Sequence, residues 1–332
     1  MNHIFIIRNL LSLKASSSIK KEMSIDNSLN LYLGEEGNAF NIIKGNMPKF
    51  EKIYSFTSIA FGGSMIEFRR NVIEFRQRVK EYLLESKASE IYITNPIHLD
   101  TSVFFFEAKK LGIKVNFYEE GICFYRGRDS KQYKVKNLRS AMKFVIYRFL
   151  KIYQGYDKLP DNWFSSLPFY HESIRIKLEY DIVEEAKKIK YLFLSRPASD
   201  DFPGVKIEDE IIAIKAFYVE SIKDSSPLYI KFHPREGKQK RKEIIDTLKA
   251  NNLNIQELNC KESSEDVVFS MESGSVGGYE TTTLVYCQSI NPVIKVYSVA
   301  EYILGKDKSG TISDFVSFYK KEFSHITYIY NK

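Results

Sequence analysis

The sequence predicts an α/β protein made of two Rossmann-like domains, each a doubly wound parallel sheet with helices on its faces. Short apolar runs alternate with helix-like patterns up to about residue 121, and the same alternation restarts at about residue 190. Regular alternation of strand and helix is typical of parallel sheets. The chain has 332 residues, of which 44% are hydrophobic and 27% are charged, so it can fill the cores of two ordinary domains.

The apolar runs of the first half fix where its elements are expected. Strands are expected at 4–7, 29–33, 52–56, 90–94 and 114–118. Helices are expected at 10–22, 67–86 and 101–111. The last of these helices is followed by Gly112, a residue suited to a helix C-terminus.

The second half repeats the pattern after a stretch without it. Strands are expected at 191–194, 228–232, 267–270 and 293–297, and helices at 207–222, 241–250 and 311–322. A further helix is expected to open within 277–283 and to run to about residue 288. The stretch between the halves has its own helix-like pattern, over 172–189. We therefore expect one domain at 1–150, a helical linker at 151–189 and a second domain at 190–332.

Several classes of protein are excluded by simple features. No apolar run approaches 18 residues, which excludes a transmembrane helix, and the apolar N-terminal run is too short for a secretory signal. The cysteines Cys123, Cys260 and Cys287 are odd in number and form no C-x-x-C pair, so a zinc site or a disulfide framework is not expected. This cysteine usage indicates a reduced, cytoplasmic protein.

The net charge of +7 is unevenly distributed. Residues 126–151 combine many cations with apolar and aromatic side chains, which is typical of a segment that binds an anionic membrane surface. The alternative is a solvated helix with one face on the core. Nucleic-acid binding is not expected, because no nucleic-acid-binding motif accompanies the segment. Its cations are Arg126, Arg128, Lys131, Lys134, Lys136, Arg139, Lys143, Arg148 and Lys151.

Two carboxylates, Glu119 and Glu120, follow the expected strand 114–118, and Gly121 comes next. Ligands of parallel sheets bind outside the carboxyl ends of the strands, so this corner is a candidate site. Two neighbouring carboxylates repel, which raises the proton affinity of one toward that of a useful base. Glycine permits a turn that other residues resist. The alternative is a surface turn with two solvated glutamates.

His233, Pro234 and Arg235 follow the expected strand 228–232 in the same way. The proline favours an extended conformation for the histidine and stops the strand. The arginine is a permanent cation suited to phosphate. A carboxylate base and a histidine acid form the pair needed to transfer a group onto a hydroxyl. The alternative is a histidine that merely ends a strand.

The stretch 273–283 joins glycines to three hydroxyls, Thr281, Thr282 and Thr283, just before a helix. A helix N-terminus lined by hydroxyls is suited to the phosphate of a nucleotide. Helix capping alone would explain one threonine. The chain has neither a G-x-x-x-x-G-K-[ST] loop nor a G-x-G-x-x-G fingerprint, which argues against ATP hydrolysis and dinucleotide binding. No D-x-D-like metal motif stands out, so a metal-independent mechanism is expected.

The order of these motifs resembles that of the bacterial sialyltransferases of the GT-B fold, which include glycosyltransferase family 52 and the polysialyltransferases. Those enzymes carry an acidic-acidic-Gly motif, a His-Pro motif and a Ser-Ser/Thr motif, and build lipooligosaccharide, O-antigen and capsule. The matching residues here are Glu119–Gly121, His233–Pro234 and Thr281–Thr283. Threonines stand where the family usually shows serines. The resemblance implies two Rossmann-like domains with a central cleft.

The resemblance also implies a reaction. Glu119 would deprotonate the acceptor hydroxyl, with Glu120 as the second candidate, and His233 would assist departure of the phosphate of CMP. Gly121, Pro234, Arg235 and the three threonines would bind the donor, CMP-sialic acid, which is a co-substrate rather than a cofactor. The first domain would hold the acceptor and the second the nucleotide sugar.

The expected function is therefore inverting transfer of sialic acid to a terminal sugar, with galactose as the expected acceptor, on a lipid-linked surface glycan. The protein would lie in the cytoplasm, with peripheral contact at the inner face of the membrane. Two alternatives remain open. One is a GT-B transferase that uses CMP-Kdo or a UDP sugar. The other is a non-catalytic protein that binds glycan or membrane.

Overall fold

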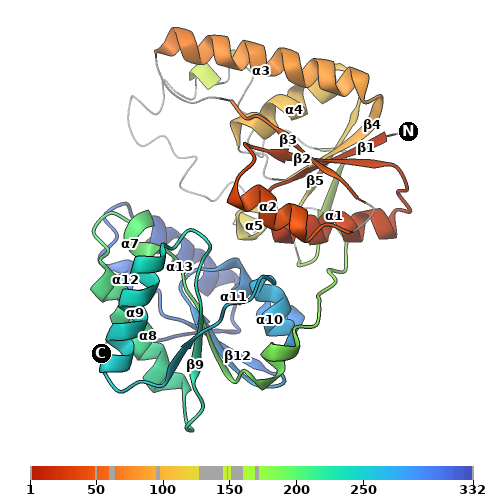
Figure 1. Ribbon diagram of the computed structural model, residues 1–332. Coiled ribbons are helices and arrows are strands. Elements are labelled where there is room, and N and C mark those ends of the chain that lie inside the picture. The colour runs from red at the N-terminus through yellow and green to blue at the C-terminus, as the bar shows by residue number, and fades with distance from the viewer. Residues whose placement is uncertain are drawn as a thin grey trace. The chain divides into compact units, whose positions relative to one another are not determined.

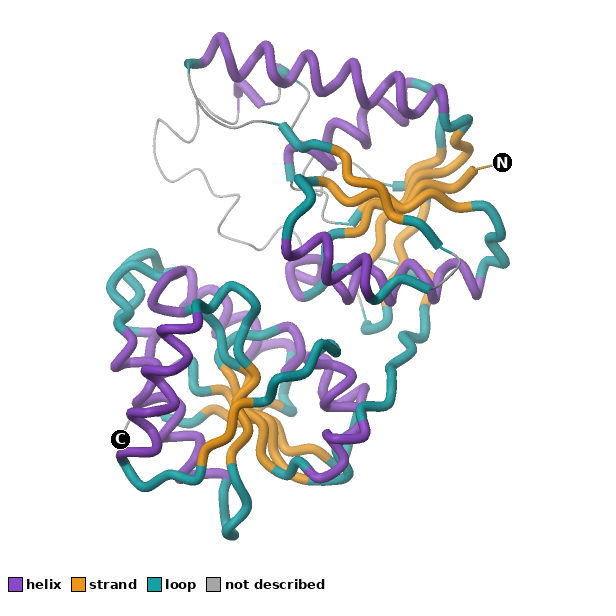
Figure 2. The backbone as a smooth tube through the Cα atoms, in the orientation of Figure 1, coloured by secondary structure: helices purple, strands orange, loops and turns teal. Residues whose placement is uncertain are grey.

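The computed structural model describes residues 2–48, 51–59, 64–94, 98–126, 145–147, 149–150, 160–168 and 172–330. The chain divides into two compact units, Met1–Glu179 and Tyr180–Lys332. Each unit holds one parallel sheet, seen edge-on between helices in Figure 1 and as the orange strands of Figure 2. The predicted α/β class with two Rossmann-like sheets is confirmed.

The first sheet has seven strands in the order β3-β2-β1-β4-β5-β6-β7, and every pair in it is parallel. Its strands are β1 Asn2–Ile7, β2 Ser28–Leu33, β3 Ile53–Phe56, β4 Ala88–Ile93, β5 Lys114–Tyr118, β6 Asn162–Ser165 and β7 Ile174–Arg175. Its helices are α1 Leu10–Glu22, α2 Asn38–Gly45, α3 Met65–Glu85, α4 Leu99–Lys110 and α5 Ile122–Arg126. Helices α1 and α2 cover one face of the sheet, and α3 and α4 cover the other (Figure 1).

The second sheet has six strands in the order β10-β9-β8-β11-β12-β13, again all parallel. Its strands are β8 Tyr191–Leu194, β9 Leu228–Lys231, β10 Ile255–Glu257, β11 Gly274–Gly278, β12 Ile294–Ser298 and β13 Ile326–Tyr328. Its helices are η4 Glu184–Lys188 (a 3₁₀ helix), α7 Ala198–Asp201, α8 Ile207–Ser221, α9 Lys238–Ala250, α10 Ser264–Ser270, α11 Thr282–Ile290, α12 Glu301–Leu304 and α13 Thr311–Glu322. Helices α8 and α9 lie on one face, and α10 and α11 on the other (Figure 1).

Local sequence explains the clearest elements. Strand β8 is buried at all four positions, as expected of a central parallel strand. Helix α3 begins at a capping box in which Ser64 and Glu67 exchange hydrogen bonds, and helix α1 begins at a similar box between Asn9 and Ser12. For α1, β5, β8 and α13, the predicted first and last residues are the same as those in the structure.

The stretch expected to be a helical linker is different. Strands β6 and β7 lie within 151–189 and extend the first sheet, and only Glu184–Lys188 of the expected helix 172–189 is helical, as a 3₁₀ turn. The units therefore meet at Glu179 and Tyr180. These strands are short, and β6 owes its place to backbone pairing with β5 and to Trp163, whose ring lies 5.1 Å from that of Phe117.

Two further expectations are corrected. Residues 267–270 are not a strand but the end of helix α10, which starts at a Ser263–Asp266 capping box. Gly277 does not open a helix, because it lies in the buried strand β11, and helix α11 begins only at Thr282. A Cβ on Gly277 would stand 2.5 Å from the ring of Phe217, so β11 needs glycine there to let helix α8 pack closely.

Candidate functional site

Parallel pairing places the carboxyl ends of the strands of a sheet at one edge, and both candidate corners lie at such edges. In the first sheet, β1, β4 and β5 are neighbours, and their ends lead to Arg8, His98 and Glu119. In the second sheet, β9, β8 and β11 are neighbours and end beside His233, Ser195 and Glu280, residues considered below. In both sheets the strand order reverses at the centre, where ligands of such folds bind.

The two glutamates of the acidic corner have different surroundings. Glu119 is fully buried, and its Oε1 accepts a hydrogen bond from the N–H of Ser166 at 3.0 Å. Its Oε2 accepts one from the hydroxyl of Tyr125. Glu120 is half-buried. Gly121 has φ 142°, a conformation that strains L side chains, which explains the glycine where the chain turns into α5.

A charged cluster stands at the same edge, outside the predicted motifs. The guanidinium of Arg8 lies 3.2 Å from Oδ1 of Asp100, which is buried. Asp100 also accepts hydrogen bonds from the hydroxyl of Ser58 at 3.1 Å and from the N–H of Thr101 at 2.8 Å. Arg8, Ser58 and the start of α4, three separate segments of the chain, thus meet at one carboxylate, which fixes the arginine beside it.

His98 belongs to this cluster, although none of the predicted motifs includes it. It is the residue before helix α4, and burial of the ring lowers its pKa. The charge of Arg8 lowers the pKa further, while those of Glu120 and Asp100 raise it. These couplings bring His98, Arg8 and Glu120 into one electrostatic group at the edge of the first sheet.

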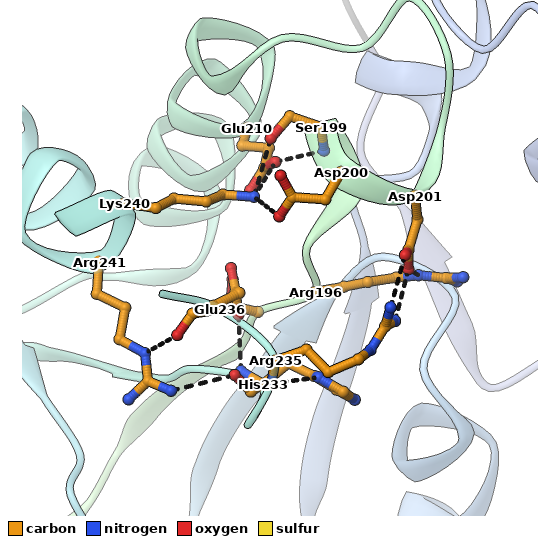
Figure 3. Close-up of polar contacts among 11 residues, drawn as sticks. Arg196, Ser199, Asp200, Asp201, Glu210, His233, Arg235, Glu236, Lys240 and Arg241 are labelled. Carbon is orange, nitrogen blue, oxygen red and sulfur yellow. Dashed lines mark hydrogen bonds and ion pairs between the residues drawn. The ribbon is translucent and has the colours of Figure 1, made fainter. Parts of the chain in front are cut away.

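The histidine corner of the second unit is organised by a buried carboxylate, Glu236 (Figure 3). One oxygen of Glu236 accepts the N–H of His233 at 2.7 Å, and the other accepts the hydroxyl of Ser195, at the end of β8, at 2.9 Å. Arg241 of α9 donates to the carbonyl of Glu236 at 2.8 Å and to that of His233 at 3.3 Å. The loop after β9 is therefore tied to β8 and to α9.

The hydrogen bonds of His233 settle which ring nitrogen carries the proton. The N–H of Arg235 donates to Nδ1 of His233 at 3.2 Å, so in the neutral ring the proton is on Nε2. Burial and the charge of Arg235 lower the pKa of His233 to about 4, with Asp201 opposing. In this state His233 is neutral at pH 7 and offers Nε2–H as a hydrogen-bond donor.

Arginines surround the histidine. Arg235 makes a two-pronged contact with Asp201, both distances being 2.8 Å, and Arg196 lies 3.5 Å from the same carboxylate. Burial opposes ionisation of Asp201, but the two arginines outweigh it and lower its pKa. Two arginines thus share the carboxylate of Asp201, and arginine is a residue suited to binding an anion.

The three threonines do not act alike. Thr281 is the N-cap residue of α11, and its Oγ1 is buried without a hydrogen-bond partner among the described residues. Thr282 is half-buried at the first position of the helix. The hydroxyl of Thr283 instead donates to Glu265 of α10 at 2.8 Å. The structure thus leaves Thr281 and Thr282 as the hydroxyls that suit a ligand.

Glu280, just before these threonines, carries a perturbed carboxyl. Its side chain is fully buried, and burial raises its pKa to about 7. Nη1 of Arg196 lies 3.9 Å away and lowers that pKa in part. Glu280 lies two residues after the end of β11, and Arg196 lies two residues after the end of β8. The strand order of the second sheet reverses between these two strands.

Sequence reasoning found the motif residues at each edge and missed several of their neighbours. Arg8 directly follows β1 and Arg196 lies two residues after β8, so the rule applied to Glu119 and His233 would have found both. Asp201 and Glu236 had no such signal. Their place depends on hydrogen bonds across the sheet edge.

Most of the predicted membrane segment, 126–151, lies outside the described residues. Arg139, Lys143, Arg148 and Lys151, the four of its cations that are tested below, lie outside the described residues. In the described part of the chain, no helix is long and apolar enough to cross a membrane.

Comparison with known proteins agrees with this architecture. A family model described as alpha-2,8-polysialyltransferase (POLYST) matches residues 3–300. No curated protein matches the chain.

Solved structures that resemble the chain share its fold. MurG of Acinetobacter baumannii has a TM-score of 0.52 at 13% identity, covering 98% of this chain and 85% of its own. A putative UDP-N-acetylglucosamine 2-epimerase of Listeria monocytogenes gives 0.54 at 8% identity, covering 98% and 89%. The UDP-GlcNAc 2-epimerase of Neisseria meningitidis, bound to UDP-GlcNAc, gives 0.51 at 12% identity, covering 98% and 93%. The chain thus has the GT-B fold, as predicted.

Proposed function

Since the chain belongs to the alpha-2,8-polysialyltransferase family, we propose that it transfers sialic acid from CMP-sialic acid to the non-reducing end of a surface glycan, with inversion and without a metal ion. The observation that carries this proposal is the family match over residues 3–300, which spans all three predicted motifs. The donor class and the type of reaction follow from the family. The residue roles below are our own assignment.

The acceptor follows from the family description. An α-2,8 linkage joins one sialic acid to another, so we propose a sialylated chain end as the acceptor. Galactose, the acceptor that the sequence motifs suggested, is the competing substrate. Capsule is the glycan class that suits a polysialic acid product, and a lipid-linked acceptor at the inner face of the membrane remains part of the proposal.

The chemistry requires two proton-handling sites. The acceptor hydroxyl gives its proton to the base as its oxygen bonds to the anomeric carbon of sialic acid. The bond from that carbon to the phosphate oxygen breaks, and CMP leaves with the electron pair. Negative charge therefore develops on one phosphate oxygen, and fixed donors around it lower the barrier.

The second unit has the groups suited to that phosphate. Nε2–H of His233 is a donor whose tautomer is fixed by Arg235, and bound phosphate would favour its protonation because opposite charges raise the pKa of a histidine. The proposed donor-binding groups are Arg235, the hydroxyls of Thr281 and Thr282, and the N-terminus of α11. Pro234 lies in the same turn as Arg235. The contact with Glu265 argues against a direct role for Thr283.

The acidic corner supplies the proposed base. Glu119 heads the motif, and its carboxylate is held by two donors, which favours the ionised form that a base needs. It is also fully buried, whereas Glu120 is half-buried, so Glu120 is the competing assignment.

A donor and acceptor screen tests the function. We expect release of CMP and growth of an oligosialic acid primer with CMP-sialic acid, and no transfer from CMP-Kdo or from UDP sugars. Growth of a galactose-terminated primer in place of the sialylated one would overturn the proposed acceptor. Transfer from a UDP sugar alone, or binding of glycan without turnover of any donor, would overturn the proposed reaction.

The two glutamates are compared in the same assay. Glu119→Gln is expected to lower kcat by at least about 100-fold, the lower end of the range for a general base, and Glu120→Gln by much less. Near wild-type kcat for Glu119→Gln would remove it as the base, and the reverse ranking would assign the base to Glu120.

A further inference from the structure

Tyr125 donates a hydrogen bond to the proposed base, and no motif includes it. It lies on the short helix α5, six residues after Glu119, and is buried. Its neighbour Phe124 packs on Trp163 of β6, with ring centroids 5.6 Å apart. The tyrosine is therefore held by the core between the ends of β5 and β6.

The direction of each hydrogen bond can be assigned. The N–H of Leu167 can only donate, and it points to the hydroxyl oxygen of Tyr125 at 3.1 Å. That oxygen accepts, so its proton is free to be donated to Oε2 of Glu119. The N–H of Ser166 donates to the other carboxylate oxygen at 3.0 Å. One oxygen of the Glu119 carboxylate thus accepts from Tyr125, whose hydroxyl in turn accepts from Leu167. The other oxygen accepts from the backbone N–H of Ser166.

This arrangement suits an ionised carboxylate. A protonated carboxylic acid would present its own O–H to one of two donors, whereas the carboxylate accepts both bonds. Donors to the charged form favour ionisation and offset the effect of burial. The backbone N–H of Ser166 is present whatever its side chain is, whereas the hydroxyl of Tyr125 depends on the residue at that position.

We propose that Tyr125 is the positioning residue of the catalytic base, and that its hydroxyl orients the carboxylate of Glu119 and keeps it ionised. The inference rests on the proposed function, because it gives Glu119 the role of base. Tyr125 acts through Glu119 and does not itself contact either substrate. A merely structural tyrosine would hold the turn after β6 without changing how the activity depends on pH.

The test is Tyr125→Phe, which removes only the hydroxyl and keeps the ring in the core. We expect kcat/KM with CMP-sialic acid and an oligosialic acid primer to fall about tenfold, and the acidic limb of its pH profile to move up by about one pH unit. The shift is upward because the carboxylate loses a donor that stabilises its charged form. CMP affinity is expected to stay within twofold, because the proposed CMP site lies in the second unit.

Tyr92→Phe is the matched control. The hydroxyl of Tyr92 in β4 also donates to a carboxylate, that of Glu90, at 3.1 Å in the same sheet. This variant also loses a tyrosine hydroxyl and its hydrogen bond to a carboxylate, but that carboxylate is Glu90 and not the proposed base. Its pH profile is therefore expected to match that of the wild type. Thermal unfolding of both variants verifies that each is folded.

A double mutant keeps the proposal testable if Tyr125→Phe also loosens the turn. If Tyr125 acts through Glu119, adding Tyr125→Phe to Glu119→Gln changes the residual rate by less than twofold. A further tenfold loss in that background, or an unmoved acidic limb in the folded single variant, would overturn the positioning role while leaving the sialyltransferase function intact. If the wild type transfers no sialic acid at all, the proposed function itself fails, and the inference with it.

Discussion

Replacement of Glu236 probes how the histidine corner is built. This buried carboxyl binds the N–H of His233 at 2.7 Å and the hydroxyl of Ser195 at 2.9 Å. In Glu236→Ala the hydroxyl of Ser195 can turn to another partner, but the backbone N–H of His233 has a fixed direction and cannot. An unsatisfied buried donor costs about 1–3 kcal/mol, which lowers the melting temperature of a unit of this size by about 2–4 °C per kcal/mol. We expect the melting temperature to fall by about 2–12 °C and kcat to fall about tenfold, because His233 is no longer fixed.

Glu236→Gln separates the hydrogen bonds from the charge. The amide oxygen can still accept the N–H of His233, and its NH₂ group can donate to the oxygen of Ser195, so we expect kcat within about threefold of wild type. Burial raises the pKa of Glu236 from 4.5 to about 6. Between these values the folded state binds more protons than the unfolded state, so the stability from this group is present below pH 4.5 and is lost as pH rises through 6.

The size of this pH effect follows from the shift. At 1.36 kcal/mol per pH unit, the change from 4.5 to about 6 corresponds to about 2 kcal/mol. Melting temperatures of the wild type and Glu236→Gln are measured from pH 4 to 7.5. As pH rises, the melting temperature of the wild type should fall relative to that of the variant by about 4–8 °C. Because other groups, such as His233, titrate in both proteins, their contribution cancels in the difference between the two melting temperatures. Parallel curves, or full activity and stability in Glu236→Ala, would refute this account.

Three other substitutions test the donor site and the membrane segment. His233→Ala should reduce kcat at least tenfold more than it weakens calorimetric binding of CMP-sialic acid, because its donor acts mainly as charge develops; unchanged turnover would remove it from the site. Changing Thr281 and Thr282 together to Val should weaken CMP itself by about tenfold, and equal CMP affinity would place the phosphate elsewhere. Neutralising four cations should lower binding to anionic vesicles, by about 1 kcal/mol each near the surface, and leave activity on a soluble acceptor unchanged; equal vesicle binding at low and moderate salt would remove the membrane proposal. These cations are Arg139, Lys143, Arg148 and Lys151.

The sequence was informative wherever one local pattern sufficed. Alternating apolar strands and amphipathic helices predicted both sheets, since a buried parallel strand must be apolar at successive positions. The strand β5 and the corner after it were predicted correctly, and so was the glycine whose φ of 142° turns the chain at Gly121. The three motifs that resemble the sialyltransferases were also visible in the sequence alone, and the family match spans them.

Tertiary structure decided what depends on contacts between distant segments. Strands β6 and β7 carry little pattern of their own, and only pairing with β5 makes them part of the first sheet. The pairing of β6 with β5 also brings Ser166 beside Glu119, to which Tyr125 of α5 donates as well, and the first glutamate of the pair is buried while the second is half-exposed. A local pattern determines which face of a strand is apolar, but the hydrogen-bond partners of a carboxylate depend on which chain ends the folded sheet places beside it.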